Sequence, residues 1–226
     1  MRRAPSGQLL SIWLPLAVPA IAMPGAPYWN AFIRLNVLLL FTYLLTLLKQ
    51  AFEAEKQLAR TDHLTRVANR RFFYELTEME LDRAHRYNHP LTVAYIDIDN
   101  FKTVNDRLGH DAGDQLLFTM AEAIKKSIRS VDRVARLGGD DFAILLPETG
   151  HEQSQVVVSK IKDMLARIAQ ERRWDVTFSI GVITCLKPPC AVEDLTKMAD
   201  KLMYAAKNDG KNSVRYELFD EQQAMV

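Results

Sequence analysis

The chain has 226 residues and a net charge of +1, with 48% hydrophobic and 25% charged residues. This length suits one domain of ordinary size plus a short extra segment, and it is long enough to bury a core. Both signs of charge are mixed along the chain, which excludes a dedicated nucleic-acid binder. The 2 cysteines exclude a secreted scaffold held together by disulfides.

Two apolar runs near the start of the chain predict a membrane anchor. Residues 9–23 are almost wholly apolar but contain two prolines, and residues 31–48 form a stronger run. At 1.5 Å per residue the second run is about 27 Å long, close to the thickness of the hydrocarbon core of a bilayer. We therefore expect residues 1–48 to form a two-helix transmembrane hairpin.

Basic residues at both ends of this anchor predict its orientation. Arg2 and Arg3 precede the first run and Lys49 follows the second, so the positive-inside bias places both ends in the cytoplasm. This favours a protein of the inner (cytoplasmic) membrane with its remaining residues in the cytoplasm. Two alternatives stay open. The first run also resembles a signal peptide, which would leave one span, and both runs could be buried core helices.

Residues 49–61 are charged and contain no glycine or proline, which predicts a helical stalk. Leu48, Ala51, Glu55 and Leu58 fall at heptad a/d spacing, which permits a short parallel coiled coil. A solvated connecting helix explains the same residues, and two heptads do not decide between the two interpretations.

Helical and strand patterns alternate through the rest of the chain. Apolar spacing predicts helices near 72–79, 117–128, 157–168 and 195–206, and strands at 91–96, 131–137, 142–146, 176–182 and 213–216. The sequence Gly138-Gly139-Asp140-Asp141 separates two of these strands and has hairpin chemistry. Neighbouring strands joined by a tight turn exclude an all-parallel sheet, so we expect an α+β sandwich.

Polar side chains gather where the strand at 91–96 ends. Asp97 at this strand end and Asp140 in the hairpin turn could together hold Mg²⁺, which prefers oxygen ligands and completes its shell with phosphates and water. The turn after the strand offers backbone N–H groups to phosphate oxygens, and Lys102 adds a cation. Asn105 and Asp114 carry the donors and acceptors that match the edge of guanine.

Seven motifs in order resemble the GGDEF family of diguanylate cyclases, and the similarity runs from about Thr61 to about Tyr216. The motifs are Asp62-His63-Leu64-Thr65, Asn69-Arg70-Arg71-Phe72-Phe73, Asp97-Ile98-Asp99-Asn100-Phe101-Lys102, Gly109-His110-Asp111-Ala112-Gly113-Asp114, Arg136-Leu137-Gly138-Gly139-Asp140-Asp141-Phe142, Ser179-Ile180-Gly181-Val182 and Ala199-Asp200-Lys201-Leu202-Met203-Tyr204-Ala205-Ala206-Lys207.

The resemblance implies a fold similar to nucleotidyl cyclases, with a five-stranded central sheet wrapped by helices. This GGDEF domain would span residues 62–218 and leave 219–226 as a tail. Family members join two GTP molecules into cyclic di-GMP and release pyrophosphate. Each domain binds one GTP, so the resemblance also implies that activity requires a homodimer.

Site residues are carried over from the family by position. Asp97, the Ile98 carbonyl and Asp140 would hold Mg²⁺, with Mn²⁺ as the alternative ion. Asp140, Asp141 and Lys102 would be catalytic. GTP would contact Phe101, Lys102, Asn105, His110, Asp114, Lys207 and Lys211, with Asn105 and Asp114 at the guanine and the lysines at the phosphates.

Arg129 and Asp132 form an R-x-x-D pattern that, in this place, resembles a product-inhibition site for cyclic di-GMP. A helix-end arginine paired with a turn aspartate is the plainer interpretation of the same two residues, and it stays open.

Two positions depart from the family. Asp141 stands where the family has glutamate, which withdraws the carboxylate by about 1.5 Å, the length of one C–C bond. A displacement of that size can cost about 10²-fold in rate. An alternative function is therefore a catalytically impaired domain that binds GTP or cyclic di-GMP and signals by contact. Arg66 replaces a usual glycine, which should affect only the first turn of the domain.

Overall fold

The computed structural model describes residues 26–58, 60–186 and 191–219. The chain divides after Leu58 into two units, an N-terminal helix and a folded domain. The first expected membrane span at residues 9–23, and all but the first residue of the expected tail, lie outside the described residues.

The described part of the N-terminal unit is one helix, α1 (Ala26–Leu58). Pro27 stands in its first turn, where a missing N–H group costs no hydrogen bond. Its stretch Tyr28–Gln50 has a mean hydropathy of 2.0, and none of it is buried against the rest of the described chain. By length and composition alone, this helix is able to cross a membrane. The second expected span and most of the expected stalk are therefore one continuous helix.

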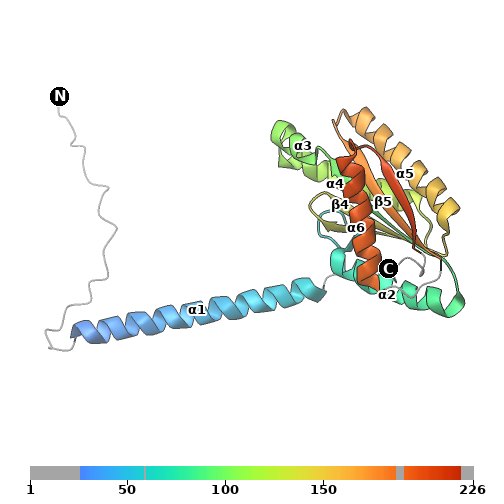
Figure 1. Ribbon diagram of the computed structural model, residues 1–226. Coiled ribbons are helices and arrows are strands. Elements are labelled where there is room, and N and C mark those ends of the chain that lie inside the picture. Colours follow the sequence, from blue (N-terminus) through green and yellow to red (C-terminus); the bar gives the residue numbers. More distant parts are fainter. Residues whose placement is uncertain (1–25, 59, 187–190, 220–226) are drawn as a thin grey trace, which may run out of the picture. The chain divides into compact units, whose positions relative to one another are not determined.

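The second unit is an α+β domain built on a mixed six-stranded sheet (Figure 1). The strands lie in the order β1-β3-β4-β2-β5-β6; the pairs β1–β3 and β5–β6 are parallel and the other pairs are antiparallel. The strands are β1 (Ala68–Asn69), β2 (Leu91–Asp99), β3 (Arg133–Gly138), β4 (Asp141–Pro147), β5 (Thr177–Cys185) and β6 (Val214–Phe219).

The expectation of five strands was wrong by one. The additional strand, β1, has 2 residues, so it is too short to show the alternating pattern on which strand prediction rests. The expected turn after β2 is present at Asn100, and helix α3 (Phe101–Leu108), which the sequence analysis did not predict, begins directly after it. Phe101, Val104 and Leu108 of α3 have helical spacing, but a helix of 8 residues is too short for that pattern to stand out.

Four longer helices cover the sheet and create two apolar cores. Helices α4 (His110–Ser127) and α5 (His151–Arg172) pack on one face, and helices α2 (Arg70–Tyr87) and α6 (Val192–Asn208) pack on the other. Figure 1 shows α5 and α6 on opposite sides of the sheet. The central strands are buried on both faces, which explains the nearly continuous apolar runs of β2 and β4; β5 places small or polar residues between its apolar ones.

Helix α6 packs directly on the backbone of β5 at Gly181. A Cβ atom at this glycine would lie 2.2 Å from the Met203 nitrogen and 2.3 Å from the Ala199 oxygen. No side chain fits in that space, so the glycine lets the helix lie closer to the sheet than any other residue would.

Candidate active site

A cluster of three carboxylates lies at the end of the β2–β4 pair. Asp97 is paired in register with Asp141, and Asp140 stands in the turn just before β4. One oxygen from each of the three side chains lies within 4.8 Å of the others. The turn itself depends on Gly138 and Gly139, whose φ angles of 145° and 54° favour glycine.

The cluster concentrates negative charge in a partly buried place. Burial, followed by the charges of Asp97 and Asp140, raises the pKa of Asp141 to about 6. Burial and the charge of Asp97 likewise raise the pKa of Asp140. Both pKa shifts mean that the charged form of each carboxylate is disfavoured in this site. A cation that binds there would stabilise the charged form.

Lys207 from α6 supplies part of the missing positive charge. Its Nζ donates a 2.7 Å hydrogen bond to Oδ2 of Asp97. Burial lowers the pKa of Lys207, but the hydrogen bond to Asp97 and the charges of the three carboxylates outweigh it and raise the pKa overall. The second oxygen of Asp97, Oδ1, is buried without a hydrogen-bond partner among the described residues.

These groups fit a divalent cation. Hard cations bind carboxylate oxygens, and a buried oxygen without a partner is where a ligand bond would be made. The side chain of Ile98 is buried in the apolar core that α4 and α5 cover, so only its backbone carbonyl could serve as the predicted ligand.

The start of α3 lies beside this cluster in the chain. Asn100 caps the helix in a left-handed conformation with φ 62°, and Phe101 and Lys102 form its first turn. Lys102 is exposed. Lys211 reaches the same helix end, since its Nζ donates a 2.9 Å hydrogen bond to Oδ1 of Asn100. Unsatisfied N–H groups at a helix start, together with lysines, suit phosphate oxygens.

The predicted guanine residues lie where α3 meets α4. A Cβ at Gly113 would lie 1.9 Å from Oδ1 of Asn105 and 3.2 Å from the Phe101 ring. Because Gly113 has no side chain, Asn105 and Phe101 can lie against α4 at this point. The residue after Gly113 is Asp114, which is exposed. His110 is exposed at the first residue of α4. Gly113 is a site residue to which the sequence analysis gave no role.

Arg129 and Asp132 contact each other. The Arg129 backbone N–H and Nε donate to Asp132 Oδ2 at 2.8 Å and 3.3 Å. Arg129 Nη2 also donates to Thr149 Oγ1 at 2.6 Å. The plainer of the two sequence interpretations therefore describes these contacts. The arginine side chain is nevertheless 56% exposed, so its outer face can take a ligand.

Arg136 is a second residue to which the sequence analysis gave no role. Its Nε and Nη2 donate to the Gly139 carbonyl at 3.0 Å and 2.8 Å, and its Nη1 donates to Asp62 Oδ1 at 3.2 Å. The arginine therefore ties the first turn of the domain to the turn that carries Asp140. Its position in the quoted motif was the only available signal.

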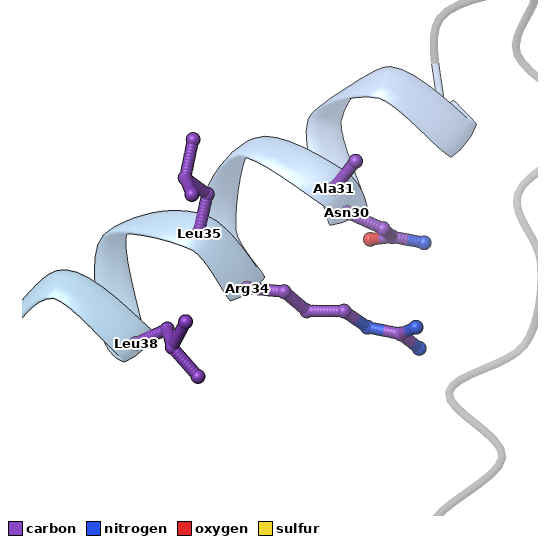
Figure 2. Close-up of a pocket in the computed structure, with 5 residues that line it drawn as sticks. All are labelled: Asn30, Ala31, Arg34, Leu35 and Leu38. Atoms are coloured by element: carbon purple, nitrogen blue, oxygen red, sulfur yellow. The ribbon is translucent and has the colours of Figure 1, made fainter. Parts of the chain in front are cut away.

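Two hollows in the surface differ in their chemistry. One of about 630 Å³ lies against α1 and is lined by Asn30, Ala31, Arg34, Leu35 and Leu38. Figure 2 shows Asn30 and Arg34 extending on the same side of that helix. The other, of about 380 Å³, is bordered by Asp141, Tyr74 and Tyr95 between α2 and α6. This second hollow leaves room beside Asp141 for a longer side chain.

Comparison with known proteins assigns the domain. The family described as "Diguanylate cyclase, GGDEF domain" matches residues 59–213. The chain is 33% identical over 169 residues to the probable diguanylate cyclase DgcT of Escherichia coli K12, covering 73% of this chain and 37% of that protein. It is 36% identical over 163 residues to the diguanylate cyclase DgcP of Pseudomonas aeruginosa, covering 71% and 24%.

Among solved structures, the chain resembles the coiled coil and GGDEF domain of DgcB from Caulobacter crescentus in complex with c-di-GMP. The TM-score is 0.65 at 27% identity, over 80% of this chain and 98% of that one. The chain spans less than two-fifths of the curated relatives named above. The match over residues 59–213 and the arrangement of the carboxylates agree, and the chain belongs to the GGDEF domain family.

Proposed function

We propose that this protein is a diguanylate cyclase that condenses two GTP molecules into cyclic di-GMP. The observation that carries the proposal is the cluster of Asp97, Asp140 and Asp141, with a buried, unpartnered oxygen on Asp97 and Lys207 beside it. That arrangement suits a triphosphate bound with a divalent cation, for which we propose Mg²⁺, with Mn²⁺ as the alternative.

The chemistry forms two phosphodiester bonds. In each step the 3′-hydroxyl of one GTP attacks the α-phosphorus of the other, the hydroxyl proton leaves, and the bond to pyrophosphate breaks. A cation held by Asp97, Asp140 and the Ile98 carbonyl would neutralise phosphate charge. Lys102, Lys207 and Lys211 would bind the phosphates, and Asn105 and Asp114 the guanine. Positioning and charge neutralisation would supply most of the rate enhancement.

One domain provides one half of this reaction. Two domains, each with its own GTP, must face each other, so we propose an active homodimer. The helix α1 is a natural element for bringing two copies together. Cyclic di-GMP would bind at Arg129 and Asp132 and inhibit the enzyme.

A direct assay tests the function. The purified full chain is incubated with GTP and Mg²⁺, and products are separated by chromatography. Formation of cyclic di-GMP supports the proposal. A folded, dimeric sample that binds GTP but forms no product refutes it in favour of the second candidate.

The second candidate is a binding module without turnover, and Asp141 favours it. Its shorter side chain can leave the carboxylate out of reach of the reacting groups. Such a domain would bind GTP or cyclic di-GMP and act through contact with other proteins. Replacing Asp141 by glutamate tests this candidate: a large gain in turnover would support impairment by the shorter side chain, and an unchanged rate would remove the reason for suspecting it.

We also propose that residues 1–48 anchor the protein in the inner membrane, that residues 49–61 form the stalk, and that the domain at 62–218 lies in the cytoplasm. The apolar stretch of α1 supports the anchor. Cell fractionation tests it: recovery of the full chain in the membrane pellet after a high-salt wash is expected, and release by salt would refute it.

A further inference from the structure

Asp99 is a buried carboxylate to which the proposed mechanism gives no role. It is the last residue of β2 and 1% exposed. Oδ1 accepts a hydrogen bond from Ser179 Oγ at 2.8 Å, and Oδ2 accepts one from Thr177 Oγ1 at 2.7 Å. Oδ2 also accepts from the backbone N–H of Asn212 at 3.1 Å. The last contact connects the sheet to the loop between α6 and β6.

This loop adopts an unusual backbone conformation. Lys211 and Asn212 have φ angles of 64° and 49°, and both are outside the range that side chains prefer. Residues in such conformations persist when surrounding contacts hold them there. Here Asp99 holds the Asn212 N–H, and Lys162 Nζ donates to the Asn212 carbonyl at 2.6 Å. The backbone N–H and C=O groups of Asn212, one in each of two successive peptide units, are therefore both held by side chains from other elements.

The fixed conformation directs Lys211 to the start of α3. Its Nζ lies 2.9 Å from Oδ1 of Asn100, the residue that follows Asp99 in the chain. Asp99 thus holds the backbone of the loop, while its neighbour contacts the lysine side chain. A lysine held in advance loses less conformational freedom when a phosphate binds than a lysine on a mobile loop does.

We propose that Asp99 is a positioning residue that presents Lys211 to the phosphates of the bound nucleotide. This rests on the proposed function, in which Lys211 binds GTP. Asp99 itself touches no substrate; it acts through the Asn212 N–H group and the conformation of the loop. Loss of that contact should weaken GTP binding through the phosphates and leave guanine recognition intact.

The variants Asp99→Ala and Asp99→Asn separate this role from simple burial. Alanine removes the acceptor of the Asn212 N–H. In the asparagine variant the side-chain oxygen can accept from Thr177 and Asn212, and the side-chain NH₂ group can donate to the hydroxyl oxygen of Ser179. We expect Asp99→Ala to weaken GTP binding about 10-fold, the size expected for loss of one charge-assisted contact, and Asp99→Asn to restore it to within about 3-fold.

Matched controls are Thr177→Val and Ser179→Ala, which remove the other partners of Asp99 but not the loop contact. Both should lower the melting temperature and leave GTP affinity unchanged. Binding is measured by calorimetry on the full chain in detergent with GTP and with guanosine. Weaker GTP binding in the controls, or an equal loss for guanosine in Asp99→Ala, would overturn the proposal.

A double-mutant cycle tests the route through Lys211. In a Lys211→Ala background, Asp99→Ala should have no further effect on GTP affinity, whereas additive losses would refute the route.

If Asp99→Ala fails to fold, hydrogen exchange of the wild type decides: the Asn212 amide should be protected, and rapid exchange would refute the contact. A wild type that binds no GTP contradicts the proposed function, whereas unaltered binding by Asp99→Ala contradicts only this inference.

Discussion

Replacing Asp141 by asparagine is expected to stabilise the metal-free domain and to stop turnover. The carboxylate lies beside Asp97 and Asp140, and its pKa rises from the ordinary 3.8 to about 6 because of burial and those two charges. Between these pH values the folded domain holds a proton that the unfolded chain has released. Stability contributed by this site therefore falls as pH rises through the window and stays lowest above pH 6.

The size of the effect follows from the shift. Each pKa unit corresponds to about 1.4 kcal/mol, so the rise to about 6 sets an upper limit of about 3 kcal/mol. Asp141 is partly exposed, and solvent screening leaves about 1 to 2 kcal/mol. A domain of this size gains about 2–4 °C in melting temperature per kcal/mol, so we expect a gain of about 2 to 8 °C.

Thermal melts of the full chain in detergent with a chelator, at pH 4 and at pH 7.5, measure this difference. The exposed Asp175 provides the matched control Asp175→Asn, which removes one charge away from the cluster. The Asp141→Asn gain should be present at pH 7.5 and absent at pH 4. A variant no more stable than the control at pH 7.5, or a gain that is equal at both pH values, would refute the raised pKa of Asp141.

Four further substitutions test the proposed site. Asp141→Glu should raise turnover by up to about 10²-fold, measured as cyclic di-GMP formed per minute, and an unchanged rate would remove the reason to call the native site impaired. Asp140→Ala should leave no detectable product, and a variant with normal turnover would disprove the metal assignment. Arg129→Ala should raise the concentration of cyclic di-GMP that halves the rate by at least about 10-fold, since a charged contact is lost; unchanged inhibition would make the R-x-x-D pattern incidental. Asn105→Ala should raise the KM for GTP about 10-fold with a smaller change in kcat, and equal losses in both parameters would contradict a role in binding guanine.

The strands and the carboxylate cluster could be predicted from sequence because both have local signals. β2 and β4 are buried on both faces and contain nearly continuous apolar runs, whereas β5 shows apolar residues at every second position. Asp97 ends the pairing of β2 with β4, two residues before β2 ends, and Asp140 stands in the hairpin turn. Local patterns place one carboxylate near the end of a strand and the other in a turn, and the family resemblance then gives them roles.

Other features depend on contacts that no local pattern encodes. Lys207 meets Asp97 across 110 positions of the chain, and the bond forms only because α6 packs over β2. Gly113 has a role because Asn105 packs against it, and this contact arises only when α3 folds against α4. Helix α3 has 8 residues, so the helical spacing of Phe101, Val104 and Leu108 covers only two turns. The contacts of Lys207 and Gly113 are set by packing between elements and not by a local sequence pattern.

The contact of α6 with Gly181 determines where Lys207 lies, although Gly181 has no reactive group. The helix rests on bare backbone there, and Lys207 follows Met203 by about one turn. A methyl group at position 181 would have to lift the helix away from the strand, and Lys207 would move with it, away from Asp97. The 2.7 Å distance between Lys207 Nζ and Asp97 Oδ2 therefore depends on the absence of a Cβ atom at Gly181. Selection for catalysis would therefore act on Gly181 as strictly as on the charged residues, although it carries no chemical group of its own.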